Sequence, residues 1–282
     1  MGLIPLNYEP IVRAALIEDI GAGDITTEAC IPPHARSSAM LLAKSAGVVA
    51  GLALAECSFR ILAPDIVWQP ELADGDQVDG HRNVIARVSG PSRALLTAER
   101  VALNLMQRMS GVATITARFV ALVAGTGATI VDTRKTTPGL RVLEKYAVRV
   151  GGGLNHRIGL YDSVLIKDNH IKAAGGVLAA VDAARSRSGH TVKIEVEAST
   201  LAQVEDALTA AADIILLDNM DCPMLRAAVA LIKGRAVTEA SGGITEATVR
   251  DVALTGVECI SVGALTHSAP AMDISLDFVN DV

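Results

Sequence analysis

From residue 128 onward, short apolar segments rich in β-branched residues alternate with longer segments of helical spacing. Strands are expected at residues 128–132, 163–167, 191–196, 213–217, 235–239 and 257–262. Helices are expected between the later strands, for example at residues 201–210 and 224–233. Repeated β–α units of this kind predict a parallel sheet with right-handed crossover connections. Six units suit either a β/α barrel or a doubly wound sheet, and the pattern alone does not separate these two.

The chain before this repeat has the mixed pattern of an α+β domain. Its apolar spacing predicts helices at residues 6–18, 52–62 and 97–124, the last broken in two at Gly111. Alternating segments predict a strand pair at residues 38–51 and antiparallel strands at 66–88. The segment 18–28 is expected to be a loop in which Glu18, Asp19 and Asp24 cap helices or form turns. Toward the other end of the chain, residues 272–278 alternate like a strand.

Basic residues gather where two of the predicted strands end. Residues 132–172 hold eight Lys and Arg against four acids, although the whole chain has a formal net charge of −6. The strand at 128–132 is followed by Arg134 and Lys135, and the strand at 163–167 ends on Lys167. Such a cluster indicates either a bound anion or a solvated surface with ordinary ion pairs.

The later strands end on acids and then on glycine-rich turns. Glu197 and Asp218 follow two of them, and the last two are followed by Ser241-Gly242-Gly243 and by Gly263-Ala264. In a β/α barrel all these ends open onto one face, where active sites lie and where late strands often bind phosphate through backbone N–H groups. Tight turns are the alternative explanation of the glycines.

Composition excludes several classes of protein. Half of the 282 residues are apolar, which excludes a disordered chain. No apolar run reaches the length of a membrane span, and no signal peptide is apparent, so a cytoplasmic location is expected. The acidic balance and 2% aromatic content argue against nucleic-acid binding. The four cysteines (30, 57, 222 and 259) have no zinc spacing and are expected to be reduced and mostly buried.

Four segments carry a resemblance to a known family. They are DTRKTTPGLR from Asp132, EKYAV from Glu144, GGGLNHRIGLYD from Gly151 and LIKDNH from Leu165. Together they resemble the quinolinate phosphoribosyltransferase family, and the likeness runs from EDIGAGDITTE to ALTHSAPAMDISLDF. The resemblance implies an incomplete (open) β/α barrel at residues 106–269. It also implies an N-terminal α/β sandwich at residues 1–105, joined by the C-terminal tail 270–282.

The resemblance also implies an activity, that of a type II phosphoribosyltransferase. Such an enzyme transfers phosphoribosyl from phosphoribosyl pyrophosphate to quinolinate with decarboxylation, giving nicotinate mononucleotide, CO2 and pyrophosphate in NAD biosynthesis. Mg²⁺ would accompany phosphoribosyl pyrophosphate, and no organic cofactor is expected. A homodimer would share each site across its interface, and a hexamer of such dimers stays open.

The site residues follow from the same resemblance. Arg134, Arg157 and the partner's Arg100 would hold the dicarboxylate, and the residues lining it would be Thr133, Lys135, His156 and Lys167. Glu197 and Asp218 would hold ribose hydroxyls or Mg²⁺, directly or through water. The 5′-phosphate would be held by Ser241, Gly242, Gly243, Val262, Gly263 and Ala264. The expected catalytic residues are Lys135, Lys167, Glu197 and Asp218, and the sequence does not choose which lysine assists departure or supplies a proton.

Several alternatives stay open at this stage. Glu195 is expected to be a second acid of the site. For Glu195 and Glu197 alike, the alternative is an ion pair with Lys193 or a neighbouring base. His170 and His267 are expected to be structural hydrogen-bonding residues. For the whole protein, the alternatives are a molybdenum-transport accessory protein, a non-catalytic metabolite binder and a different phosphate-binding barrel enzyme.

Overall fold

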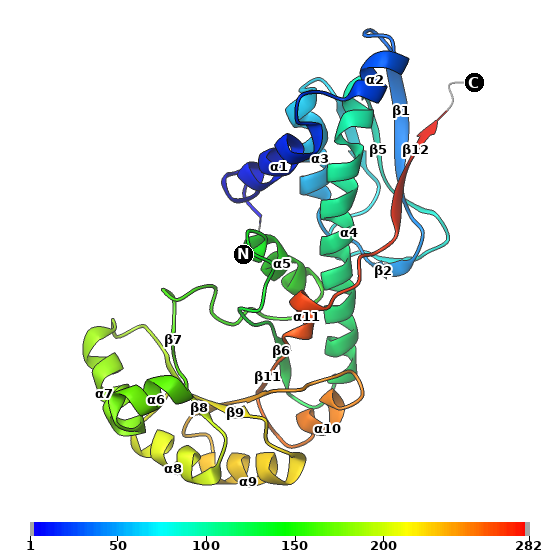
Figure 1. Ribbon diagram of the computed structural model, residues 1–282. Coiled ribbons are helices and arrows are strands. Elements are labelled where there is room, and N and C mark those ends of the chain that lie inside the picture. Colours follow the sequence, from blue (N-terminus) through cyan, green and yellow to red (C-terminus); the bar gives the residue numbers. More distant parts are fainter. Residues whose placement is uncertain (1–2, 280–282) are drawn as a thin grey trace. The chain divides into compact units, whose positions relative to one another are not determined.

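The computed structural model describes residues 3–279 and divides the chain into two compact units (Figure 1). The first unit comprises Met1–Ala117, Thr136–Gly152 and Ser268–Val282, and the second comprises Arg118–Lys135 and Gly153–His267. The mixed α/β fold expected from the sequence is confirmed, with an antiparallel sheet in one unit and a parallel sheet in the other. The domain boundary placed between residues 105 and 106 stays a prediction.

The first unit is built on a four-stranded antiparallel sheet in the order β12-β1-β5-β3. Its strands are β1 (Arg36–Ala43), β3 (Val67–Pro70), β5 (Asn83–Pro91) and β12 (Ile274–Val279). The tail strand β12 lies beside β1 along its whole length, the red strand next to the blue one in Figure 1. The strand predicted at residues 272–278 is therefore confirmed, and it ties the end of the described chain to its beginning.

Two expectations for the first unit are wrong. The strands at residues 38–51 do not pair with each other, because β2 (Ala46–Val48) pairs instead with β4 (Gln77–Asp79). The segment 18–28 is not all loop, because α1 (Pro5–Ile20) extends into it and α2 (Ile25–Cys30) begins directly after Asp24. Asp24 caps α2 by accepting a hydrogen bond from the Thr27 N–H at 2.9 Å, as its residue type favours.

The remaining helices of this part include α3 (Leu52–Leu62), α5 (Arg141–Val150) and the long α4 (Ser92–Leu122). The predicted break of α4 at Gly111 is wrong, since the helix runs through it. Gly111 instead lets the backbone at Pro270 approach the helix closely. A Cβ at Gly111 would lie 2.0 Å from the carbonyl oxygen of Pro270. A missing side chain at this position lets the tail 268–279 lie against α4.

The second unit is built on a six-stranded parallel sheet in the order β6-β11-β10-β9-β8-β7. The strands are β6 (Thr129–Val131), β7 (Val164–Ile166), β8 (Ile194–Ala198), β9 (Ile214–Asp218), β10 (Val237–Ser241) and β11 (Cys259–Ser261). From β7 to β11 the strands follow one another in chain order, and β11 then pairs with β6, the first strand. This order is that of a barrel and not of a doubly wound sheet. Within the described residues no strand pairing joins β6 to β7, so the barrel is open, as predicted.

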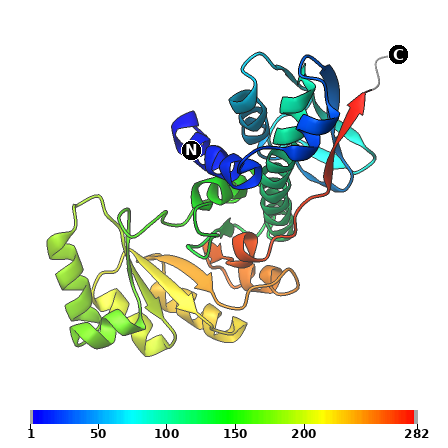
Figure 2. The ribbon, with the colours of Figure 1, turned by 45° about the horizontal axis from the view of Figure 1, so that its top comes forward.

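Helices follow the strands of the second unit. They are α6 (Asp168–Ala174), α7 (Val177–Arg187), α8 (Leu201–Thr209), α9 (Cys222–Ile232), α10 (Val249–Ala253) and α11 (Ala264–His267). In Figure 2, α7, α8 and α9 lie along one face of the sheet. That face is apolar, because Val196 and Leu217 on neighbouring strands are fully buried. The helices predicted at residues 201–210 and 224–233 are confirmed.

Two further expectations concern the whole chain. The four cysteines are free, but they are less buried than predicted: Cys30 is exposed and the other three are half-buried. Among the described residues, no helix is both long and apolar enough to cross a membrane.

Candidate active site

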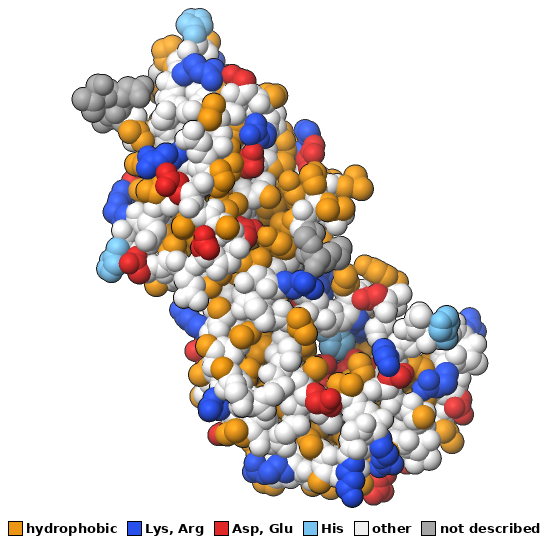
Figure 3. All heavy atoms as spheres, turned by 180° about the vertical axis from the view of Figure 1, so that it is seen from behind, with side chains coloured by type: hydrophobic (Ala, Val, Ile, Leu, Met, Phe, Trp, Pro, Cys, Tyr) orange, Lys and Arg blue, Asp and Glu red, His pale blue; other side chains and the backbone are white. Residues whose placement is uncertain are grey.

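A pocket of about 620 Å³ opens at the carboxyl ends of the parallel strands in the second unit. Its lining includes most of the site residues expected from the sequence, namely Thr133, Arg134, Lys135, His156, Arg157, Lys167, Glu197, Asp218, Ser241, Gly242 and Gly243. In the space-filling view, basic and acidic side chains lie beside a hollow in which a histidine is visible (Figure 3). The cluster of basic residues is therefore part of a pocket and not only of a solvated surface.

The period of two along each strand explains which side chains enter the pocket. Successive residues of a strand point to opposite faces, so alternate residues share the inner face of the barrel. On β10 these residues are Glu239 and Ser241, which line the pocket, while Ala240 between them is buried among apolar groups. The strands β8 and β10 each end two residues later than expected, which makes Glu197 and Ser241 part of the strands.

Two arginines stand at one side of the pocket. Arg134 follows β6, and Arg157 follows the short segment at Leu154 that bridges to Val131. Burial lowers the pKa of Arg157, and the positive charge of Arg134 lowers it further. Two guanidinium groups that repel each other in a partly buried pocket favour a ligand with two negative charges, because planar guanidinium binds carboxylate through paired hydrogen bonds.

Two carboxylates of the same lining, Glu197 and Asp218, come at the ends of β8 and β9. Glu197 Oε2 lies 2.9 Å from Lys167 Nζ. Burial raises the pKa of Asp218, and the neighbouring charge of Glu197 raises it further. Both acids therefore sit close enough to share a positive partner. Carboxylate oxygens are the ligands that Mg²⁺ prefers, so these residues fit such an ion.

The turn after β10 is shaped to approach a ligand closely. Gly242 and Gly243 have φ of 96° and 62°, which place both in the left-handed region that favours glycine. Asn219, which the sequence analysis missed, holds this turn: its backbone N–H donates to the carbonyl of Ser241 at 2.9 Å. Its side-chain Nδ2 donates to Asp218 at 2.8 Å. The signal for this role was an asparagine directly after a strand, since asparagine tolerates a positive φ, here 54°.

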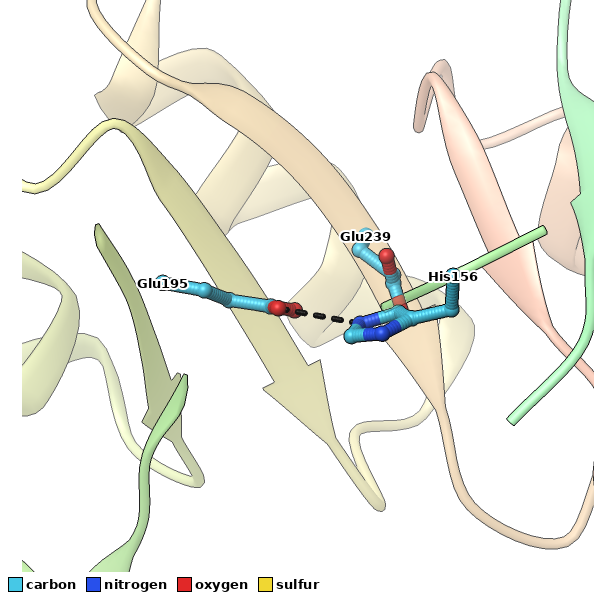
Figure 4. Close-up of side chains that lie close together, drawn as sticks. All are labelled: His156, Glu195 and Glu239. Atoms are coloured by element: carbon cyan, nitrogen blue, oxygen red, sulfur yellow. Dashed lines mark ion pairs between the residues drawn. The ribbon is translucent and has the colours of Figure 1, made fainter. Parts of the chain in front are cut away.

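His156 is held from both sides. The buried Asp132 accepts a hydrogen bond from the His156 backbone N–H at 2.9 Å and another from Asn155 at 2.6 Å. The ring then reaches two buried carboxylates, Glu195 and Glu239, as Figure 4 shows. Glu195 was expected either in the site or in an ion pair with Lys193 or a neighbouring base. Lys193 is not its partner, because Lys193 Nζ lies 3.4 Å from Asp213. The neighbouring base that Glu195 contacts is His156.

Other expected residues lie outside the pocket lining. Val262 is buried, and its backbone N–H donates to the carbonyl of Val131. Gly263 lies between the side chains of Lys135 and His267, and Ala264 begins α11. His170 has the structural role expected of it, since its Nδ1 accepts from the Lys167 N–H at 2.9 Å. Arg100 belongs to α4 in the first unit and is 59% exposed.

Comparison with known proteins identifies what the chain resembles. The family model described as "Quinolinate phosphoribosyl transferase, C-terminal domain" matches residues 112–277, and the one described as the N-terminal domain matches residues 24–110. A probable carboxylating nicotinate-nucleotide pyrophosphorylase of Bacillus subtilis (strain 168) is 45% identical, covering 96% of this chain and 93% of its own. A decarboxylating quinolinate phosphoribosyltransferase of Nicotiana tabacum is 46% identical, covering 96% of this chain and 82% of its own.

Solved structures agree with these sequence matches. The crystal structure of NadC from Streptococcus pyogenes superimposes with a TM-score of 0.94 at 40% identity, covering 99% of this chain and 100% of that one. The nicotinate-nucleotide pyrophosphorylase of Francisella tularensis gives a TM-score of 0.94 at 37% identity, covering 99% and 98%.

Proposed function

This chain belongs to the quinolinate phosphoribosyltransferase family, and we propose that it makes nicotinate mononucleotide for NAD biosynthesis. It is a phosphoribosyltransferase that moves the phosphoribosyl group of phosphoribosyl pyrophosphate to quinolinate, with release of CO2 and pyrophosphate. The observation that supports this most is one pocket with two arginines, two lysines, three carboxylates and a glycine turn.

Quinolinate is a pyridine with two adjacent carboxylates, and the arginine side of the pocket suits it. Arg134 and Arg157 would each pair with a carboxylate, with His156 beside them. The partner's Arg100 would complete the group across a dimer interface. This dimer is part of the proposal; the exposed side chain of Arg100, 3.9 Å from Glu99, fits a residue that serves another subunit.

Phosphoribosyl pyrophosphate suits the opposite side. The turn at Ser241-Gly242-Gly243 would take its 5′-phosphate through backbone N–H groups. Glu197 and Asp218 would hold the ribose hydroxyls and Mg²⁺, which neutralises negative charge on the departing pyrophosphate. Lys135 lies in the same pocket as a second source of positive charge.

The reaction then follows from positioning and fixed charge. The pyridine nitrogen attacks C1 of the ribose, and the C1–O bond to pyrophosphate breaks. The ring nitrogen becomes positively charged, so the ring can accept the electron pair of the bond between C2 and its carboxylate. That bond breaks, CO2 leaves, and C2 takes a proton. Preorganised cations contribute to the first step by stabilising the charge that develops on pyrophosphate.

The test uses purified protein, Mg²⁺, phosphoribosyl pyrophosphate and quinolinate, with CO2 and nicotinate mononucleotide measured together. A parallel sample contains nicotinate in place of quinolinate. We expect equal amounts of the two products from quinolinate and none from nicotinate. A folded protein that binds a phosphorylated ligand but makes no product would instead support the accessory or metabolite-binding alternatives. The cytoplasmic location stays a prediction, since several plant relatives are named mitochondrial or chloroplastic.

A further inference from the structure

Three ionisable side chains meet in the wall of the pocket, and the roles assigned so far do not explain them. His156 Nε2 lies 2.9 Å from Glu195 Oε2 and 3.6 Å from Glu239 Oε1, and Figure 4 shows the ring directed toward both acids. The side chains are 12%, 2% and 6% exposed, respectively. Within the described residues, one oxygen of each glutamate is buried without a hydrogen-bond partner, Oε1 in both.

The charge of Arg157 acts on Glu195, whereas the basic group that acts on Glu239 is His156. Two buried carboxylates face one imidazole, and a buried ion without a full set of partners is costly. Burial, the charge of Glu195 and, less strongly, that of Asp132 raise the pKa of Glu239, whereas His156 and a hydrogen bond with Ser261 lower it. The net effect raises the pKa of Glu239 to about 7. The thiol of Cys259, on the neighbouring strand, also faces this acid. Near neutral pH, Glu239 therefore carries a proton for a substantial part of the time.

A metal ion is the alternative occupant, because the three ligand atoms lie within 4.8 Å of one another. The hydrogen bonds of the histidine disfavour it. The backbone N–H of Arg157 donates to His156 Nδ1 at 2.7 Å, so Nδ1 has no hydrogen. A neutral ring must then carry its hydrogen on Nε2, the atom that faces Glu195. A metal-binding histidine has the opposite arrangement, with the remote nitrogen donating its hydrogen to an acceptor.

The position of Glu239 suits the transfer of its proton to a bound substrate. The acid lies beside His156. His156 directly precedes Arg157, which is proposed to bind the dicarboxylate. On its own strand it lies two residues before Ser241, where the phosphate turn begins. Glu239 lines the same pocket as His156 and Ser241, so the proposed binding mode would put it near the junction of the pyridine ring and the ribose. The arginines cannot act as acids, and the ammonium group of Lys167 is engaged by Glu197. Lys135, the other lysine of the pocket, is proposed to offset the charge of pyrophosphate.

We propose that Glu239 is the general acid that gives C2 of the ring its hydrogen after CO2 has left. This inference rests on the proposed function and extends it. The electron pair that stays on C2 when the C2–CO2 bond breaks takes the proton from the Glu239 carboxyl group, and a C2–H bond forms. Glu239 is left as a carboxylate beside the His156 ring and regains a proton from water before the next turnover. His156 and Glu195 are positioning residues for this acid.

The experiment is a single turnover of Glu239→Gln with Mg²⁺, phosphoribosyl pyrophosphate and quinolinate, stopped at intervals and assayed for pyrophosphate and nicotinate mononucleotide. Glutamine keeps the shape of the side chain but has no acidic proton. We expect pyrophosphate release close to the wild-type rate and nicotinate mononucleotide formation slower by roughly 10²-fold or more. In the wild type, the mononucleotide-forming step should slow as the pH rises through about 7, the pKa of Glu239, and the variant should lack this dependence.

Two further variants keep the result interpretable. Glu239→Asp retains an acid and should recover part of the lost rate. Glu258→Gln is the matched control, because Glu258 accepts hydrogen bonds from Thr238 outside the pocket lining, and both steps should stay at wild-type rates. Equal slowing of both steps in Glu239→Gln, or no slowing of either, overturns the inference and leaves the proposed function intact. Absence of quinolinate-dependent pyrophosphate release in the wild type overturns the proposed function itself.

Discussion

Asn219 fills the space that a side chain at Gly242 would need. A Cβ at Gly242 would lie 2.1 Å from the Oδ1 atom of Asn219, a distance that no real contact tolerates. The same asparagine donates a hydrogen bond to Asp218. The glycine turn and the carboxylate at the end of β9 are therefore positioned by one side chain, so a shift at either is passed to the other.

Replacement of Gly242 by alanine should weaken the binding of phosphoribosyl pyrophosphate. The new methyl group must displace Asn219, and the backbone must keep a φ of 96° that alanine rarely adopts. We expect the KM for phosphoribosyl pyrophosphate to rise roughly tenfold or more, equivalent to 1.4 kcal/mol or more, with a smaller change for quinolinate. Steady-state kinetics with each substrate varied in turn measures this, and equal changes in both KM values would contradict it.

Removal of a pocket cation should strongly reduce turnover without unfolding the protein. Arg134→Ala and Lys167→Ala each remove a charge from the pocket, and we expect turnover to fall roughly 10²-fold or more. Arg134→Lys keeps the positive charge but loses the planar guanidinium group that binds a carboxylate through two hydrogen bonds. Its turnover of quinolinate should therefore also be low. Lys172→Ala is the control, because Lys172 is 72% exposed and pairs with Asp168 one helical turn away. Near-normal turnover of both alanine variants at unchanged melting temperature would refute the assignment.

A shared active site predicts complementation between two inactive variants. Arg100→Ala lacks the residue given to the partner, and Lys167→Ala lacks a residue of its own pocket. In a mixed dimer one of the two sites has both residues, so random mixing should restore about a quarter of the wild-type turnover. The measurement is activity after joint unfolding and refolding of the two variants in equal amounts. No recovery, with mixed dimers demonstrated by differently tagged chains, would argue against the shared site.

The raised pKa of Glu239 also predicts a stability effect. Its folded-state pKa of about 7 lies above its ordinary value of 4.5, so the folded state holds a proton between these values that the unfolded state has lost. The free energy of unfolding therefore falls as pH rises through this window, by about 3 kcal/mol for a shift of this size. Glutamine does not ionise, so Glu239→Gln avoids this loss. The melting temperature of the variant minus that of the wild type should therefore be larger at pH 8 than at pH 5. Equal pH dependence of the two melting temperatures would show that Glu239 ionises normally.

Gly111 should be intolerant of any side chain. A methyl group there would overlap the carbonyl of Pro270, so α4 and the tail strand could not both keep their places. We expect Gly111→Ala to destabilise the protein by about 3 kcal/mol, since backbone atoms must move. Gly189→Ala is the matched control, because nothing lies within 4 Å of its added Cβ. Melting of the two variants side by side tests this, and equal melting temperatures would contradict it.

The part of the site that follows from strand ends could be predicted from the sequence. Lys167, Asp218 and Ser241 come at or directly after recognisable apolar strands, and parallel strands place such residues at one edge. The choice between a barrel and a doubly wound sheet could not be predicted, because it depends on β11 pairing with β6. That contact joins segments more than a hundred residues apart, and no local pattern encodes it.

Glu239 and Gly111 show why the remainder was missed. From the sequence, Glu239 was interpreted only as the last residue of a strand. Its proposed role depends on Glu195 and His156, which the curvature of the sheet brings next to it. Gly111 was taken as a helix breaker on residue type, whereas its role comes from Pro270 across the first unit. In both cases a long-range partner decides what the residue does, and local propensity cannot supply that partner.

The seam between β6 and β7 has a mechanical consequence. In a closed barrel, backbone hydrogen bonds fix the distance between every pair of neighbouring strand ends. Here the seam separates the strand that leads to Arg134 from the strand that leads to Lys167, and the described residues form no ladder across it. Within the sheet, the path from β6 to β7 runs through four other strands, β11, β10, β9 and β8. A change in the width of the pocket mouth at this seam would break no hydrogen bond between β6 and β7.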